Sequence, residues 1–328
     1  MKTAPCMWIL FVLIAGAGGA RPGATAGPGT AEATSAQVFR SAVELVALNV
    51  VVTDDRLRFV PNLQNRDFVV LEDGVPQDIS FFADGQVPLD LIILIDTSSS
   101  MSATRAMAHK AATGFLQVLR PEDRGAVVGF NHGVSVLQDL SNDVPALQAA
   151  VGLAGTNGTT SLYTAVYIAL KQFGRPALQA NQVRRQAIVA LTDGEENTSG
   201  LAFDDLLGEA RSRGVAVYAI MLQCESLAER ERIEGRLMPS RRAMKELARE
   251  TGALAYFPKR GTDLQGVYAT IAAELTSQYS MAYVPRNAGH GSALRQIAIR
   301  VASRPGLRTR ARTAYLSSGP ALRLAALR

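Results

Sequence analysis

Three side chains of this 328-residue chain could bind a metal ion together. They are Asp96, Ser98 and Ser100, which are spaced two residues apart. They follow directly on the apolar run Leu91–Ile95 (LIILI), which is typical of a strand covered on both faces. A hard divalent cation binds oxygen ligands, and Mg²⁺ takes six in an octahedron, several of them from water. One carboxylate and two hydroxyls on a turn after a buried strand can therefore face one such ion.

Two further loops carry oxygen-bearing side chains. One is Thr156–Thr160 (TNGTT), in which Gly158 permits a close approach of the backbone. The other is Thr192–Glu195 (TDGE), which follows the apolar run Ala187–Leu191 (AIVAL). Because ligands in open α/β sheets bind where loops leave the carboxyl ends of the strands, we expect all three loops to converge on one edge.

The elements that must position these loops alternate between strand and helix from Leu89 onward. Apolar runs predict strands, and 3.6-residue spacing predicts helices, with Met107, Ala111, Phe115 and Val118 on the core side of the first helix. The predicted strands are 91–95, 126–130, 134–137, 187–191, 215–220 and 254–257, and the predicted helices are 102–119, 144–153, 162–173, 203–213, 241–250 and 264–275. This alternation predicts an α/β fold with a doubly wound, mostly parallel sheet. The charged stretch Leu222–Ser240 is expected to be an exposed helical excursion, and we assign it no role.

Segments with the short apolar runs of β-strands precede and follow this α/β region. Before it, strands are expected at 43–52, 68–71 and 79–82, with Asp73-Gly74 as a tight hairpin turn between the last two. After it, strands are expected at 279–284, 297–301 and 308–315. Three strands alone are too few to bury a core, so we expect both segments to join in one small β domain. The α/β domain would then be an insertion within it.

At this point the chain resembles the von Willebrand factor type A (VWA) family, whose metal-ion-dependent adhesion site uses a DxSxS motif, a threonine and an aspartate on three loops. The motif matches at Asp96, Ser98 and Ser100, the threonine best at Thr160 (Thr159 is the other register) and the aspartate at Asp193. The match runs from about residue 89 to residue 277. The resemblance implies a Rossmann-like fold and one Mg²⁺ or Mn²⁺ ion that bridges to an acidic side chain of a protein partner.

The flanking segments are also similar to a bacterial family of VWA-related proteins first noted among acidobacteria. The similar stretches are LNVVVTDDRLRFVPNLQNRDFVVLEDGVPQDISFF and QYSMAYVP. We therefore divide the chain into a signal peptide (1–20), a flexible linker (21–36), a β segment (37–86), a VWA domain (87–279), a second β segment (280–317) and a basic tail (318–328).

Other functions fit the residues less well. A scaffold or assembly component of an envelope complex could use the same site to hold a subunit. A metal-dependent hydrolase would need a general base, and no His or extra carboxylate is evident beside the three loops. A haloacid dehalogenase-type phosphatase needs an acid where Ser98 stands, and a dinucleotide-binding domain needs a Gly-rich turn where TSSSM stands. One structural alternative is a VWA fold without a working metal site. Glu195 and Glu196 could add a ligand, but they are expected to be solvated loop charges. We predict that His109, His132 and His290 are structural.

The ends of the chain predict its location. Lys2, the apolar core Met7–Ala15 and small residues before position 20 are typical of an export signal, with a retained membrane anchor as the alternative. Hydrophobic content of 48% and charged content of 19% describe a globular protein, and a net charge of +5 does not call for a nucleic-acid partner. From Val284 to Arg328 there are nine Arg and no Asp or Glu. This basic end is either a solvated edge or the contact for an acidic partner such as a polymer or lipid headgroup.

Overall fold

The computed structural model describes residues 45–85, 87–155, 158–173, 183–193, 199–222, 227–258, 264–286 and 294–317, without the side chains of 227–238. The chain divides into two compact units, Met1–Ala42 and Val43–Arg328, and the described residues belong to the second. The predicted signal peptide, linker and basic tail lie outside the described residues. No helix in the described part of the chain is long and apolar enough to cross a membrane.

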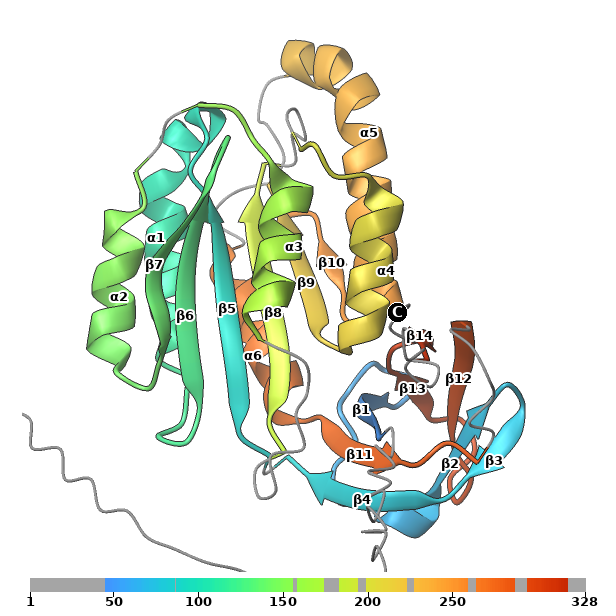
Figure 1. Ribbon diagram of the computed structural model, residues 1–328. Helices are drawn as coiled ribbons and strands as arrows, with labels where there is room; N and C mark the ends of the chain where they lie inside the picture. Colours follow the sequence, from blue (N-terminus) through green and yellow to red (C-terminus); the bar gives the residue numbers. More distant parts are fainter. Residues whose placement is uncertain are drawn as a thin grey trace, which may run out of the picture. The chain divides into compact units, whose positions relative to one another are not determined.

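The central sheet has six strands in the order β10-β9-β8-β5-β6-β7 (Figure 1). The strands are β5 (Leu89–Asp96), β6 (Arg124–Phe130), β7 (Val134–Ser141), β8 (Arg185–Thr192), β9 (Ala216–Met221) and β10 (Ala255–Tyr256). All neighbours are parallel except β6 and β7. Every residue of β5 and of β9 is buried, as expected for strands that are covered on both faces. The predicted doubly wound, mostly parallel sheet is therefore confirmed.

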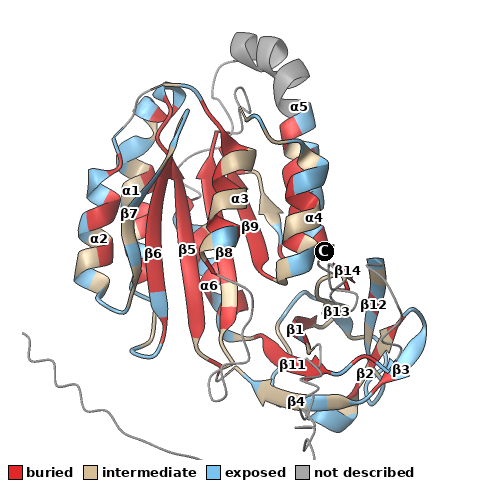
Figure 2. Cartoon of the chain, in the orientation of Figure 1, coloured by how far each residue is buried: buried red, intermediate tan, exposed pale blue. Residues whose placement is uncertain are grey.

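Six α-helices cover the two faces of this sheet. They are α1 (Arg105–Leu116), α2 (Val144–Leu153), α3 (Leu162–Gln172), α4 (Phe203–Arg213), α5 (Leu227–Glu250) and α6 (Leu264–Thr276), and two 3₁₀ turns are η1 (Asn65–Asp67) and η2 (Ser99–Ala103). Helices α1, α2 and α6 pack on one face, and α3 and α4 pack on the other with part of α5 (Figure 2). Asp143 caps α2 by accepting a hydrogen bond from the amide of Ala146 (3.0 Å).

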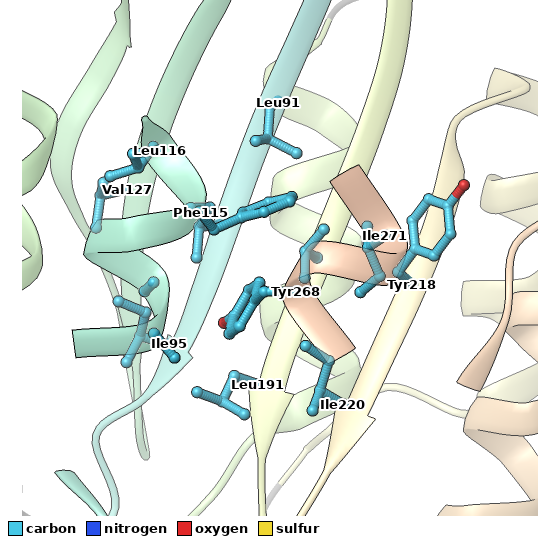
Figure 3. Packing of buried hydrophobic residues seen from close by; sticks show 14 of the residues in the cluster. Leu91, Ile95, Phe115, Leu116, Val127, Leu191, Tyr218, Ile220, Tyr268 and Ile271 are labelled. Atoms are coloured by element: carbon cyan, nitrogen blue, oxygen red, sulfur yellow. The ribbon is translucent and has the colours of Figure 1, made fainter. Parts of the chain in front are cut away.

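The core beneath the three loops is dense and aromatic. The rings of Phe115 of α1 and Tyr268 of α6 pack in a tilted arrangement with centroids 4.9 Å apart. Both rings lie with Ile95 and Leu191, near the carboxyl ends of β5 and β8, in one cluster (Figure 3). This packing fixes the ends of the two strands from which two of the three loops emerge.

Two further sheets, which we call the β region, are built from strands of both ends of the chain. Their strands are β1 (Val46–Thr53), β2 (Phe68–Glu72), β3 (Val75–Gln77), β4 (Ile79–Asp84), β11 (Tyr279–Tyr283), β12 (Leu294–Val301), β13 (Arg308–Arg310) and β14 (Ala314–Leu316). The orders are β13-β1-β11-β4 and β14-β12-β2-β3, so each sheet joins N-terminal strands to C-terminal ones. The α/β fold is thus flanked by β sheets from both segments, as predicted.

Two details of that prediction are wrong. Asp73 (φ 49°) and Gly74 (φ 82°) do form a tight turn, but it pairs β2 with the short β3, while β4 pairs with β11 in the other sheet. The predicted strand 308–315 is two strands, β13 and β14, in different sheets. In both cases the chain passes from one sheet to the other within a few residues. The pattern of hydrophobic residues predicts strands but does not show which sheet each strand joins.

Two helices also differ from the prediction. The predicted helix 241–250 and the excursion before it form one helix, α5, with Pro239 inside it. Val118 lies after the end of α1 and is 43% exposed, because the helix ends at Leu116 and core contacts come from Ala108, Ala112 and Leu116 itself. The wrong residue was assigned to the core because the helix was predicted to continue to residue 119.

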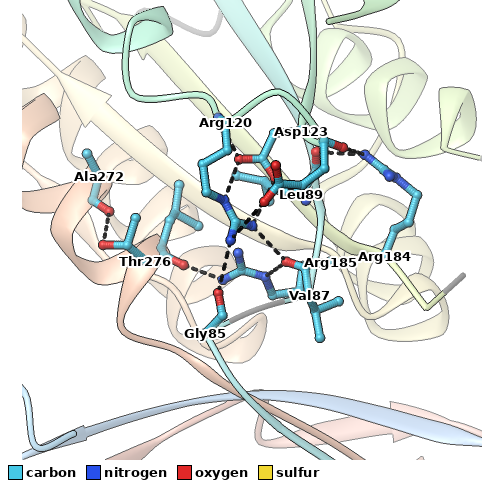
Figure 4. A network of polar contacts seen from close by, with 11 residues as sticks. Gly85, Val87, Leu89, Arg120, Asp123, Arg184, Arg185, Ala272 and Thr276 are labelled. Atoms are coloured by element: carbon cyan, nitrogen blue, oxygen red, sulfur yellow. Dashed lines mark hydrogen bonds and ion pairs between the residues drawn. The ribbon is translucent and has the colours of Figure 1, made fainter.

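The segment that links β4 to β5 is held by two arginines (Figure 4). Arg120 donates to the carbonyls of Gly85 (3.4 Å) and Val87 (3.2 Å), and Arg185 donates to the carbonyl of Val87 (2.9 Å). Arg185 also donates to the carbonyl of Leu275 near the end of α6. One buried guanidinium therefore ties together the two chain crossings between the central sheet and the β region.

The basic C-terminal segment finds acidic partners inside the chain. Arg310 of β13 pairs with buried Glu274 of α6 (2.5 Å), and Arg295 pairs with Asp73 (2.9 Å). Arg286 pairs with Asp78. Arg310 and Arg295 thus have acidic partners within the chain, whereas Arg286 and Asp78 form a largely exposed pair, as expected for a solvated edge.

Candidate metal centre

Two of the three predicted loops leave the carboxyl ends of the neighbouring strands β5 and β8, at what we call the carboxyl edge of the central sheet, and the third loop joins α2 to α3. Strands β5 and β8 are parallel partners, with Ile95 opposite Leu191. Asp96 is therefore the last residue of β5 beside Thr192, the last of β8. The third loop is attached by the amide of Ser99, which donates to the carbonyl of Gly158 (3.1 Å).

The DxSxS loop is folded around its own aspartate. The amide of Ser98 donates to Asp96 Oδ1 (2.8 Å), and Thr192 Oγ1 donates to Asp96 Oδ2 (2.6 Å). The hydroxyl oxygens of Ser98 and Ser100 lie 3.0 Å apart. Asp96 and Ser98 are buried, whereas Ser100 is exposed at the rim of the loop.

Asp193 and Thr160 complete the predicted set, and both are buried. Thr160 stands just before α3, and its neighbour Ser161 donates its amide to the carbonyl of Asn131 (2.8 Å). The alternative register, Thr159, is exposed. Thr160 lies two residues after Gly158, whose carbonyl accepts the hydrogen bond from Ser99, so its loop is attached to the DxSxS loop.

The two carboxylates act on each other. Burial, and next the charge of Asp193, raise the pKa of Asp96 to about 6, while hydrogen bonds from Ser98 and Thr192 oppose the rise. In the described part of the chain Asp96 makes no ion pair with Lys or Arg. A buried negative charge beside a second carboxylate is an arrangement that a bound cation would stabilise.

The donor set fits a small divalent cation. Two ligands on neighbouring corners of a Mg²⁺ octahedron lie about 2.9–3.0 Å apart, because each lies roughly 2.0–2.1 Å from the ion. Ser98 Oγ and Ser100 Oγ have this separation, 3.0 Å. Among the described residues no three His, Cys, Asp or Glu side chains form a metal-binding group, so a cation here depends on the hydroxyls as well as the carboxylates.

One family model matches this part of the chain. Residues 91–196 match the model described as von Willebrand factor type A domain. We call the matched residues the VWA domain. The match includes all five predicted ligand positions.

Solved structures of VWA proteins are similar to the chain at low identity, and no curated protein sequence matches it. A von Willebrand factor type A protein from Catenulispora acidiphila is 12% identical, with 85% of this chain and 74% of that chain covered at a TM-score of 0.48. The pilus adhesin SpaC from Lactobacillus rhamnosus GG, in its open conformation, is 11% identical, with 81% and 41% covered at 0.48. Proximal thread matrix protein 1 from the mussel byssus, with a zinc-occupied MIDAS motif, is 15% identical, with 62% and 50% covered at 0.47.

The VWA domain contains two contacts at the carboxyl edge that sequence reasoning missed. Thr192 is fully buried and holds Asp96, although it is not one of the five family positions. His132, predicted to be structural, is exposed and lies against Gly158 (φ 80°), where an added Cβ would be only 2.8 Å from the imidazole Nδ1. The close approach expected at Gly158 is present. Glu195 and Glu196 lie outside the described residues.

Proposed function

We propose that the chain is a metal-dependent protein-binding module. In this proposal Asp96, Ser98, Ser100, Thr160 and Asp193 hold one Mg²⁺ or Mn²⁺ ion at the carboxyl edge of the VWA domain. The ion supplies a positive charge and an open coordination position that an acidic side chain of a partner can fill.

One observation carries the proposal. Two buried carboxylates, Asp96 and Asp193, act on each other beside two hydroxyl oxygens 3.0 Å apart. Two carboxylates balance the charge of one divalent ion, so the loaded site would be near neutral and could accept a further carboxylate.

Binding is favoured over hydrolysis by the same residues. The two described carboxylates at the carboxyl edge, Asp96 and Asp193, are assigned to the ion, and His132 lies against Gly158 with its ring exposed. Among the described residues we therefore assign no general base for a bound water. A scaffold component that holds a subunit through this site is the other binding function, and it predicts a partner that co-purifies with the chain.

Metal binding is tested by heating the purified full chain in EDTA and with added Mg²⁺ or Mn²⁺. Saturating metal should raise the melting temperature by roughly 5 °C, because a ligand that binds only the folded state stabilises it. Asp96→Ala and Ser100→Ala should remove the response. Ser102→Ala is the matched control, because Ser102 is an exposed serine of the same segment whose hydroxyl donates to the carbonyl of Ser99. An unchanged response in Asp96→Ala would refute the site.

The partner is tested by affinity capture from the native cell envelope with and without EDTA. A bridging ion predicts a partner that EDTA releases and that Asp96→Ala does not capture. Capture that is equal in all three conditions would refute the bridge.

We also propose that the chain is exported, which rests on the leader-like residues 1–20. Mass spectrometry of the protein isolated from its host should find a new N-terminus near residue 21. An intact Met1 would contradict cleavage.

A further inference from the structure

Thr192 occupies an unusual position beneath the candidate metal centre. It ends β8, its side chain is fully buried, and its Oγ1 donates to Asp96 Oδ2 over 2.6 Å. This length is typical of a hydroxyl that donates to an ionised carboxylate. The residue contacts a predicted ligand from a different strand and is not itself a predicted ligand.

The backbone of Thr192 is fixed on both sides. Its neighbour Leu191 pairs with Ile95 of β5, and Thr192 pairs with Met221 of β9. The carbonyl of Thr192 accepts a hydrogen bond from the amide of Leu222 (2.8 Å). Because a β-branched side chain in a strand has few rotamers, the hydroxyl has a set direction.

Both oxygens of the Asp96 carboxylate are therefore engaged before any ion binds. Oδ2 accepts from Thr192, and Oδ1 accepts from the amide of Ser98 (2.8 Å). A carboxylate has about four acceptor positions, so each oxygen keeps capacity for a cation or a water molecule. The carboxylate as a whole, however, is held against rotation.

We propose that Thr192 is a positioning residue that sets the affinity and the metal preference of the site. The inference rests on the proposed function. With the carboxylate held at both oxygens, Asp96 offers one oxygen to the ion, directly or through water. Such a fixed ligand suits the strict octahedron of Mg²⁺, whereas Ca²⁺ favours flexible sites with more ligands and bidentate carboxylates.

The test compares Thr192→Val, which keeps the shape but removes the hydroxyl, with Thr192→Ser, which keeps the hydroxyl. Isothermal titration of the full chain with MgCl₂ and with CaCl₂ measures both affinities. Thr192→Val should bind Mg²⁺ at least ~10-fold more weakly, the size of effect that outer contacts of metal ligands have. Its preference for Mg²⁺ over Ca²⁺ should fall, and Thr192→Ser should restore both.

A second readout needs no metal. Hydrogen exchange in EDTA at the amide of Ser98 should be faster in Thr192→Val, because a carboxylate released at Oδ2 holds that amide less firmly. Thr251→Val is the matched control. Thr251 is also buried, and its hydroxyl donates to the carbonyls of Leu247 and Ala248, so its loss should change stability but neither metal affinity nor Ser98 exchange.

The outcomes separate this inference from the proposed function. If the wild-type chain binds neither Mg²⁺ nor Ca²⁺ and its melting temperature does not respond to Mn²⁺, the proposed function fails, and the positioning role fails with it. If the wild-type chain binds Mg²⁺ and Thr192→Val binds both ions with wild-type affinities, the metal site stands and the role of Thr192 is only structural.

Discussion

Strand β5 has a buried aspartate near each end, and the fold treats the two in opposite ways. Asp90, in the second position of the strand, accepts hydrogen bonds from Arg124 Nε (2.8 Å) and Nη2 (2.7 Å) and from Arg184 Nε (2.8 Å). Asp96, at the other end, accepts from a hydroxyl and an amide and lies close enough to Asp193 for its pKa to rise. Their side chains are equally well covered, at 3% and 2% exposure.

The difference shows where the fold has supplied a cation and where it has not. A buried carboxylate needs a compensating charge or strong hydrogen bonds to remain ionised. At Asp90 two arginines provide the compensating charge. The carboxylate of Asp123 is paired in the same way with Arg120. At Asp96 the fold adds a second carboxylate instead. The Asp90 end therefore carries its own compensating charge, and the Asp96 end keeps the negative charge to which the proposed metal ion would bind.

The largest effect should come from Asp90→Ala. This change leaves Arg184, whose side chain is 16% exposed, and Arg124 without their shared acceptor. Breaking a buried pair in this way costs about 3–5 kcal/mol, which urea denaturation in EDTA would measure. The variant should keep its response to Mg²⁺.

Asp78→Ala is the control for this change, because the pair of Asp78 with Arg286 is largely exposed and should contribute less than about 1 kcal/mol. A folded Asp90→Ala variant that no longer responds to Mg²⁺ would contradict the independence of the two ends.

Asp96→Asn should have an intermediate effect, and it should stabilise the metal-free protein rather than destabilise it. The raised pKa of Asp96 means that its ionised form is disfavoured in the folded protein by up to about 3 kcal/mol near neutral pH. Removing the charge should therefore raise the melting temperature in EDTA while it abolishes the response to Mg²⁺. A metal-free variant less stable than wild type at pH 7 would show that the bonds from Thr192 and Ser98 outweigh the repulsion.

The charge of Asp96 should also make the stability of the metal-free protein depend on pH. The pKa of Asp96 is about 6 in the folded protein against an ordinary value of 3.8, so the folded state binds the proton more tightly. The penalty is fully present above pH 6 and is relieved as the pH falls from 6 towards 3.8. The gap in stability between Asp96→Asn and wild type, measured in EDTA, should close over this interval. A difference in stability that stays constant between pH 7 and pH 4 would show that the ionisation of Asp96 is not its cause.

The smallest effect should come from Arg124→Gln. The side chain of Arg124 is 44% exposed, and Arg184 still holds Asp90 when it is removed. We expect a loss below about 1 kcal/mol by urea denaturation. Arg184→Gln should cost more, because the side chain of Arg184 is better covered and also donates to the carbonyls of Leu89 and Glu122. Equal losses would mean that the two arginines share Asp90 equally.

The sequence by itself determined much of the fold. Continuous apolar runs such as Leu91–Ile95 predict strands covered on both faces, and they alternate with helical patterns. That alternation sufficed for the doubly wound sheet and for its carboxyl edge. The positions of the loops with Asp96 and Asp193 follow from it, because strand order decides which strand ends share an edge. The loop with Thr160 joins two helices, and its contact with the first loop, from the amide of Ser99 to the carbonyl of Gly158, came only from the structure.

The tertiary structure alone decided which charges are paired. Asp90 and Asp96 differ little in their sequence surroundings, since both flank the same apolar run. Arg184 reaches Asp90 from 94 residues away, and Thr192 reaches Asp96 from 96 residues away. Local spacing has no information about such partners, because parallel pairing brings together residues separated by whole helices. The sequence thus predicted where a cation could bind, and the folded chain decided which of the two aspartates pairs with arginines.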